Sequence, residues 1–336
     1  MSRRRTALVE ESDGADLSKA VLGTALVAMA AALFGMLSYL ARGAEAAGVD
    51  ALPFVAWRGG IAALTLLLAG VVVGRRTGTP MLPDIRLLKP DRRVALLLAS
   101  LCGALLNIAI FAAFLRMPIA VALICFYTFP AIVTLAAVPL YGERLGLVRL
   151  SALGLSMVGL VLVLLPSLTG AGGLSVDPLG LVLALFAAVC QAAFVLIAGR
   201  GFNPLPVIGV STYVVLAAVV VSVPLAVLMG EGAGLVGPFQ APDAWVWVLV
   251  GGILCAAIPT SAFVAGIGLI GPSRAAILMT IEPLVGVTLA ALLLGEQPSP
   301  IQVVGGACVL FAAAALQIAP RTTSEIPAEA EVGRTV

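Results

Sequence analysis

The chain contains ten runs of about 20 predominantly apolar residues, each bounded by charged residues, proline or glycine. The runs cover residues 20–40, 53–73, 94–115, 119–140, 148–168, 178–199, 206–229, 245–270, 273–294 and 299–319. A helix needs about 20 apolar residues to cross the hydrocarbon core of a bilayer. The composition agrees, because 61% of the 336 residues are hydrophobic and only 11% are charged. The sequence therefore predicts an all-α integral membrane protein with ten transmembrane helices.

Positive charge is distributed unevenly between the connections of these helices. If the N-terminus is cytoplasmic, sixteen of the 19 Lys and Arg residues lie in cytoplasmic segments, Arg42 and Arg116 lie outside, and Arg58 falls within a predicted helix. Short cytoplasmic loops carry such an excess of positive charge. We therefore expect both termini in the cytoplasm. The net charge of +2 gives no indication of a nucleic-acid partner.

Several classes of chemistry lack their usual residues. The chain has no histidine, which excludes histidine metal sites, Ser-His dyads and histidine proton relays. Its five cysteines lie inside predicted helices and form no C-x-x-C pair, and we find neither a phosphate-binding glycine loop nor an acidic cluster for magnesium. We therefore expect no metal, no cofactor and no enzymatic activity.

The two halves of the chain resemble each other. When residues 127–146 are laid on residues 280–299 without a gap, five identities occur at a shift of 153, and the same shift pairs Pro53 with Pro206. The five identical pairs are Pro130 and Pro283, Ala137 and Ala290, Leu140 and Leu293, Gly142 and Gly295, and Glu143 and Glu296. The sequence therefore indicates a duplicated unit of five helices.

An odd number of helices per unit gives the two units opposite orientations in the membrane. Such inverted repeats are typical of secondary transporters, whose substrate site lies near the bilayer midplane between the repeats. We assign residues 1–19 to a cytoplasmic N-terminal tail, 20–168 and 178–319 to the two repeats, and 320–336 to a cytoplasmic C-terminal tail. Residues 1–18 and 320–336 are polar, and we expect them to be disordered.

The proline pair in the fourth and ninth helices and the Gly-Glu endings "LYGERL" and "LLGEQP" resemble those of EamA-type transporters of the drug/metabolite transporter superfamily. The resemblance covers about residues 20–319. It implies a ten-helix bundle with a central cavity that usually exports amino acids, nucleosides, drugs or other metabolites. One difference is the "ALFGM" stretch at residues 32–36, which lacks the tryptophan that the family often carries there.

Glu282 is the residue that most needs an explanation, because it lies midway along an apolar run. A carboxylic acid at the centre of a membrane helix costs about 2.5–3.5 kcal/mol on insertion scales. Its helical neighbours are small or apolar, so we expect a partner on another helix or in a cavity. A carboxyl group that is neutral and charged in turn suits a proton carrier or a ligand for a substrate ammonium. A structural hydrogen bond to a neighbouring helix is the alternative.

Other residues within the predicted helices are further candidates. Pro130 and Pro283 predict kinks that serve as gates or expose carbonyl groups, or that only shape the helices. Phe129 takes the place of Glu282 in the first repeat, and the two could hold a cation or an amphipathic zwitterion by cation–π contact and ion pairing. Arg58 either extends to the outer surface, or binds a substrate carboxylate or pairs with Glu282.

The remaining candidates are polar groups inside helices and residues at helix ends. Asn107, Gln191 and Tyr127 line a cavity or form hydrogen bonds between helices. At the ends of the fourth and ninth helices, glycine suits a left-handed turn and glutamate suits the start of the next helix, so we expect structural hinges at these positions, namely Gly142, Glu143, Gly295 and Glu296.

Together these features predict a bacterial inner-membrane secondary transporter that exports a small polar or amphipathic metabolite by alternating access. The expected partners are the substrate and the lipid bilayer, with protons as a candidate coupling ion, in a monomer or a dimer. A passive facilitator or channel, an importer of the same fold, a membrane enzyme and a non-transporting receptor are the alternatives. Solute counterflow in vesicles would distinguish the transporter from them.

Overall fold

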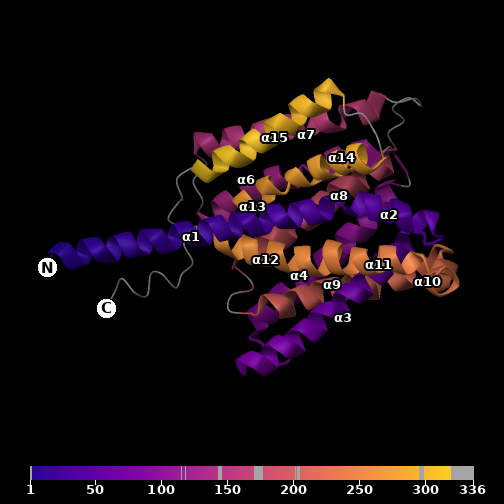
Figure 1. Cartoon of the computed structure of the whole chain (residues 1–336), viewed down its shortest axis with the longest axis horizontal. Helices are drawn as coiled ribbons and strands as arrows, with labels where there is room; N and C mark the ends of the chain where they lie inside the picture. Colours follow the sequence, from indigo (N-terminus) through magenta and orange to yellow (C-terminus); the bar gives the residue numbers. More distant parts are fainter. Residues whose placement is uncertain are drawn as a thin grey trace.

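The computed structural model describes residues 2–114, 116–117, 119–142, 146–169, 177–200, 202, 205–294 and 299–318. The regular structure of these residues is helical throughout (Figure 1). The first half contains α1 (Ser2–Gly35), α2 (Leu37–Ala46), α3 (Ala51–Thr77), α4 (Pro90–Phe114), α5 (Ile119–Phe126), α6 (Phe129–Tyr141) and α7 (Leu147–Thr169). The second half contains α8 (Pro178–Arg200), α9 (Val207–Leu228), the 3-10 helix η1 (Gly232–Val236), α10 (Gly237–Gln240), α11 (Ala244–Gly252), the π-helix η2 (Ile253–Ala257), α12 (Ile258–Ile270), α13 (Pro272–Leu278), α14 (Ile281–Leu294) and α15 (Pro300–Ile318).

These elements make nine helical units in the described ranges that are long and apolar enough to cross a membrane, with α15 as a shorter apolar helix. Five of the nine precede residue 177, and this odd number sends the second half of the chain back in the opposite direction. The prediction of an all-α membrane protein is confirmed. The predicted boundaries agree within a few residues, except that the first unit continues through α2 to Ala46 instead of ending at residue 40.

The prediction for the N-terminal tail is wrong. We expected residues 1–18 to lack regular structure, but α1 begins at Ser2 and extends beyond the bundle at one end (Figure 1). Much of this segment consists of Ala, Leu, Glu and Arg, which have high helix propensity, and it contains no proline, so nothing in it stops a helix that continues from the apolar part. The predicted C-terminal tail, residues 320–336, lies outside the described residues.

Helix ends repeat at the spacing found in the sequence. The helix α5 begins at Ile119, and α13 begins 153 residues later at Pro272. The helix α6 ends at Tyr141, and α14 ends 153 residues later at Leu294. The duplicated sequence therefore folds into two units whose fourth members are each divided into two half-helices.

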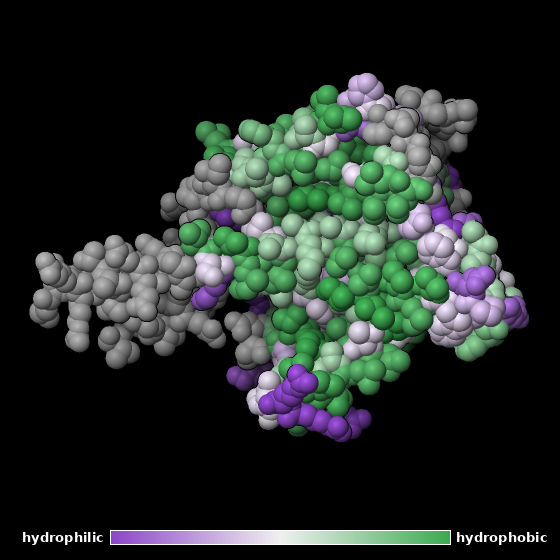
Figure 2. Space-filling view, viewed as in Figure 1, coloured by the Kyte–Doolittle hydropathy of each residue, from purple (hydrophilic) through white to green (hydrophobic). Residues whose placement is uncertain are grey.

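The outer surface of the bundle is apolar over most of the face in Figure 2, and hydrophilic residues gather towards its ends. Large side chains such as Leu64 (58% exposed), Val182 (60%) and Phe311 (69%) point outward from α3, α8 and α15. Lipid tails solvate such side chains, whereas in a soluble protein a continuous surface of this kind promotes aggregation.

The last helices of the two halves of the chain, α7 and α15, lie side by side along one edge of the bundle (Figure 1). Their backbones approach closely at Gly159 and Gly305. A Cβ atom on Gly305 would lie 2.6 Å from the Gly159 carbonyl oxygen, and one on Gly159 would lie 2.7 Å from the Gly305 carbonyl oxygen. Small residues permit this approach, and van der Waals packing then holds the helices together in the apolar phase.

The substitution Gly305→Ala should lower the melting temperature of the purified protein. The added methyl group meets backbone atoms that cannot move aside, and such overpacking costs about 1–3 kcal/mol. Gly154→Ala on α7 is the matched control, because a Cβ there meets nothing within 4 Å. Equal melting temperatures for the two variants would contradict the close contact between α7 and α15.

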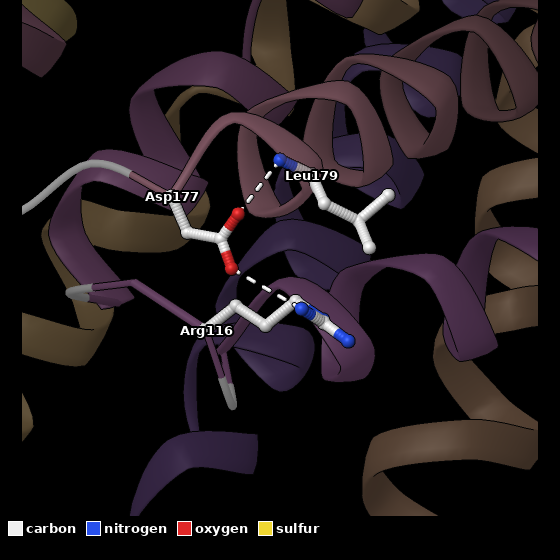
Figure 3. A network of polar contacts seen from close by, with 3 residues as sticks. All are labelled: Arg116, Asp177 and Leu179. Atoms are coloured by element: carbon white, nitrogen blue, oxygen red, sulfur yellow. Dashed lines mark hydrogen bonds and ion pairs between the residues drawn. The ribbon is translucent and has the colours of Figure 1, made fainter.

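One ion pair connects the two repeats at the surface. Asp177 lies immediately before α8, and its carboxylate accepts hydrogen bonds from the backbone N–H of Leu179 at 2.8 Å and from Nη1 of Arg116 at 3.2 Å (Figure 3). Arg116 belongs to the connection between α4 and α5. The Leu179 bond, with the help of Arg116, holds the pKa of Asp177 below its usual value.

A lowered pKa means that the ionised Asp177 stabilises the fold above the pKa of the unfolded chain, about 3.9, and that this contribution disappears as the pH falls through the folded-state pKa. Asp177→Asn should therefore lower the melting temperature at pH 7. The difference from the parent protein should disappear in an acid series that extends below about pH 4. A difference that stays constant across the series would show that the charge of Asp177 is not involved.

Candidate functional site

Four membrane-crossing units are interrupted inside the bundle. The first breaks between α1 and α2 at Met36, the fourth between α5 and α6 at Tyr127 and Thr128, and the ninth between α13 and α14 at Met279 and Thr280. The eighth is continuous from α11 to α12 but contains the π-helix η2 between them. Irregular backbone inside a membrane is tolerated where it is buried in protein or lines an aqueous cavity, and π-helices often mark functional sites.

The two matched prolines lie just after two of these breaks. Pro130 is the second residue of α6 and Pro283 is the third residue of α14. In the first turn of a helix the missing N–H costs little, because that group has no partner within the helix. The carbonyl that we expected Pro283 to free belongs to Met279, and it accepts the Glu282 N–H at 3.0 Å. The prolines therefore start new half-helices instead of bending continuous ones.

Glu282 lies in the first turn of α14, where the helix dipole favours a negative charge. Its carboxylate accepts a hydrogen bond from the hydroxyl of Tyr127, which lies at the corresponding break of the first repeat. It also interacts electrostatically with Arg58. Both partners come from the other repeat, so Glu282 connects the two halves of the protein.

Arg58 is buried, with 9% of its surface exposed, and does not extend to the outer surface. Its Nη1 donates to the carbonyl oxygen of Cys255 at 3.2 Å, and its Nη2 donates to Oδ1 of Asn107 at 3.4 Å. Cys255 lies within η2, where the wider turn makes a main-chain carbonyl available to another helix. Asn107 is oriented in turn, because its Nδ2 donates to the Gly103 carbonyl at 2.7 Å.

Arg58 retains capacity for a ligand. Its guanidinium has five N–H donors, of which two have acceptors among the described residues, and its buried Nε has none there. The positive charge of Arg58 and the negative charge of Glu282 act on each other without a direct ion pair. A space between two opposite charges is suited to a ligand that carries both charges.

A cavity of about 970 Å³ contains these groups. It reaches the connections at Asp50 and Glu231, and we call this the open end of the bundle. The opposite end, with the connection from Gly78 to Lys89 and with Gly142, contributes no lining residue and is called the closed end. All six predicted binding residues line the cavity together with one of the prolines, namely Glu282, Phe129, Tyr127, Asn107, Gln191, Arg58 and Pro283.

The other predicted positions lie elsewhere. Pro130 is buried and does not line the cavity. Gly142 follows α6 with φ of 67°, a left-handed conformation that glycine adopts without strain. Glu143, Gly295 and Glu296 lie outside the described residues.

Sequence reasoning missed two kinds of lining residue. The first is a set of aromatic rings, Phe111, Phe126, Phe194 and Phe263, of which Phe194 and Phe263 stack with centroids 6.3 Å apart. A phenylalanine in an apolar helix carries no signal that separates cavity from core. The second is Thr260, which the repeat could have identified, because it lies 153 residues after Asn107.

In the described part of the chain no group of His, Cys, Asp or Glu side chains is arranged to hold a metal ion. The lining instead combines charged side chains of both signs, with Arg58 and Glu282 at its inner part and Arg42, Glu45, Asp50 and Glu231 towards the open end, with neutral hydrogen-bonding groups and aromatic rings. Such an arrangement binds a small organic molecule, and the irregular helices around it provide places where the backbone can move.

A multi-pass helical fold of two repeats around a polar-lined cavity defines a membrane transporter. The model of the EamA-like transporter family matches residues 21–165 and 178–317, so the chain belongs to this family and is a transporter and not an enzyme. A relative in Synechocystis sp., named uncharacterized transporter sll1319, is 26% identical over 249 residues, which cover 70% of this chain and 72% of the relative. A solved crystal structure has the same fold, with a TM-score of 0.72 and 21% identity over 90% of this chain and 96% of that one.

The electrostatic interaction between Arg58 and Glu282 should appear in a double-mutant cycle. Each of Arg58→Met and Glu282→Gln removes one charge and leaves the other buried without compensation, so the double variant should lose less stability than the two singles together. The expected coupling is about 0.5–3 kcal/mol, measured by unfolding in mixed micelles. Pairing Glu282→Gln with Arg76→Ala, an exposed arginine, should give additive effects. Additivity for Arg58 and Glu282 as well would contradict the interaction.

Proposed function

We propose that this protein is a secondary transporter that moves a small amphipathic metabolite across a bacterial inner membrane by alternating access. The observation that carries the proposal is the cavity between the two repeats, in which Arg58 and Glu282 present opposite charges beside aromatic rings. Inverted repeats allow one half to rock against the other around such a site. Among the described residues, those that line the cavity reach one end of the bundle only, as alternating access requires of each conformation.

The same residues favour a zwitterionic substrate that has an apolar group. A carboxylate of the substrate would bind Arg58, which has unused donors, and an ammonium group would bind Glu282 in place of Tyr127. The rings of Phe129, Phe194 and Phe263 would accommodate the apolar part. A neutral or singly charged molecule would leave at least one of the two protein charges without a partner.

We further propose that both termini are cytoplasmic, that the open end faces the outside, and that the net movement is export. The uneven distribution of Lys and Arg supports the orientation. Glu282 could also serve as a proton carrier, which would couple export to a proton gradient. This alternative uses the same residue and differs in the ligand that Glu282 holds.

Three compounds that share the same aromatic group but differ in charge test whether the substrate is a zwitterion, a cation or an anion. We would measure the melting temperature of the purified protein with phenylalanine, phenethylamine and 3-phenylpropionate, which are a zwitterion, a cation and an anion. A ligand at 100 times its dissociation constant adds about 2.7 kcal/mol of stability. We expect the zwitterion to stabilise the parent protein most and to lose this effect in both Glu282→Gln and Arg58→Met.

Stabilisation by the anion alone, or equal stabilisation of the parent and Glu282→Gln by the zwitterion, would overturn the proposed substrate class. A wider panel of amino acids, nucleosides, vitamins and amines covers other apolar groups. Solute counterflow in vesicles with any stabilising compound then separates a transporter from a channel, because a channel shows no counterflow. Export predicts net outward movement from right-side-out vesicles, and dependence of that movement on a pH gradient would identify proton coupling.

A further inference from the structure

The two repeats are fastened together at the closed end by Tyr141 and Arg200. Tyr141 is the last residue of α6 in the first repeat, and Arg200 is the last residue of α8 in the second. The Arg200 guanidinium lies 4.6 Å from the centroid of the Tyr141 ring, and its Nη2 donates to the Tyr141 carbonyl at 3.5 Å. The Tyr141 hydroxyl donates to the carbonyl of Leu196, one turn earlier in α8. Tyr141 thus makes two contacts with Arg200 and a third with Leu196 across the repeat boundary.

The surrounding backbone brings these residues close together. A Cβ atom on Gly199 would lie 3.2 Å from the Tyr141 hydroxyl and 3.3 Å from Pro272, so α8 lies tightly against both α6 and the start of α13. Nη1 of Arg92, from α4, donates to the Arg200 carbonyl at 3.4 Å. Opening of this end requires α6 and α8 to separate and therefore breaks the contacts between Tyr141 and Arg200.

The repeat shows that these contacts belong to one conformation only. When inverted repeats exchange their conformations, the contacts that close one end are replaced by contacts between the matched residues at the other end. At the shift of 153, Tyr141 corresponds to Leu294 and Arg200 corresponds to Ala47. Leucine and alanine have no aromatic ring, hydroxyl or guanidinium, so the opposite conformation has no equivalent of these contacts.

We propose that Tyr141 and Arg200 form a one-sided latch that holds the closed end shut and biases the empty transporter towards the conformation seen here. The latch rests on the proposed alternating access but not on any particular substrate. A cation–π contact at an exposed site shifts an equilibrium by about two- to fivefold. Loss of the latch should therefore raise the population of the opposite conformation by about this factor.

Two matched positions report on this population without a ligand. Leu123 lines the cavity, whereas Ala276, 153 residues later, is fully buried in α13. When the two repeats exchange their conformations, position 276 should become exposed and position 123 should become buried. Each would carry a single cysteine, as Leu123→Cys or Ala276→Cys, in a protein whose five native cysteines are replaced by alanine. Reaction with a maleimide in lipid nanodiscs gives the rate at each position.

The variants Tyr141→Leu and Arg200→Ala remove the latch. Each introduces the type of residue that the other repeat has at the matched position. We expect each to increase labelling at position 276 by about two- to fivefold and to decrease labelling at position 123 by a smaller factor, because the conformation that exposes position 123 is the more populated one. Arg76→Ala removes the same charge from an exposed position at the same end and should change neither rate. Unchanged rates in the latch variants would overturn the latch, and so would a rise at both positions, which indicates unfolding. Failure of the zwitterion to bind would leave these labelling results unaffected.

Discussion

Two opposite charges, on Arg58 and Glu282, are buried among helices that lipid solvates, and the architecture of the cavity depends on stabilising them. Lipid cannot do so, so each charge requires fixed dipoles, a counter-charge or the water of a cavity. The π-helix η2 provides the Cys255 carbonyl for Arg58, and the break between α5 and α6 places the Tyr127 hydroxyl beside Glu282. The irregular parts of the helices thus have an electrostatic reason as well as a mechanical one.

The same arrangement explains why the interruptions occur together. A broken helix leaves N–H and C=O groups without partners, which is costly in hydrocarbon, so several breaks must share one protein-lined or water-filled space. Here the breaks of α5–α6 and α13–α14 are joined directly by the hydrogen bond between Tyr127 and Glu282. In the proposed function, an ammonium group that displaces Tyr127 from Glu282 would release one break from the other and so link binding to movement of the half-helices.

Most of the fold could be predicted from the sequence, because apolar runs bounded by charges mark membrane helices and the shift of 153 reveals the duplication. The helical start at Ser2 was missed, since the polarity and lack of periodicity of residues 1–18 indicated disorder, and their helix-favouring composition without proline was given too little weight. The candidate site was predicted in part: Glu282 and Arg58 stand out as charges in apolar helices. Their relation to Asn107, Cys255 and Tyr127 depends on how distant helices pack, and the π-helix has no recognisable sequence pattern.

Duplication gives the two halves one fold, and divergence gives them different chemistry. A protein with identical inverted repeats would have two conformations of equal free energy, because each is the other turned over. At the shift of 153, Glu282 corresponds to Phe129 and Arg58 to Ser211, so a substrate bound as proposed would meet different side chains in the two halves. The equilibrium between the conformations is set by whichever contacts are present in one and absent from the other. If the protein works by alternating access as proposed, the substitutions that separate the repeats determine which conformation the empty transporter prefers.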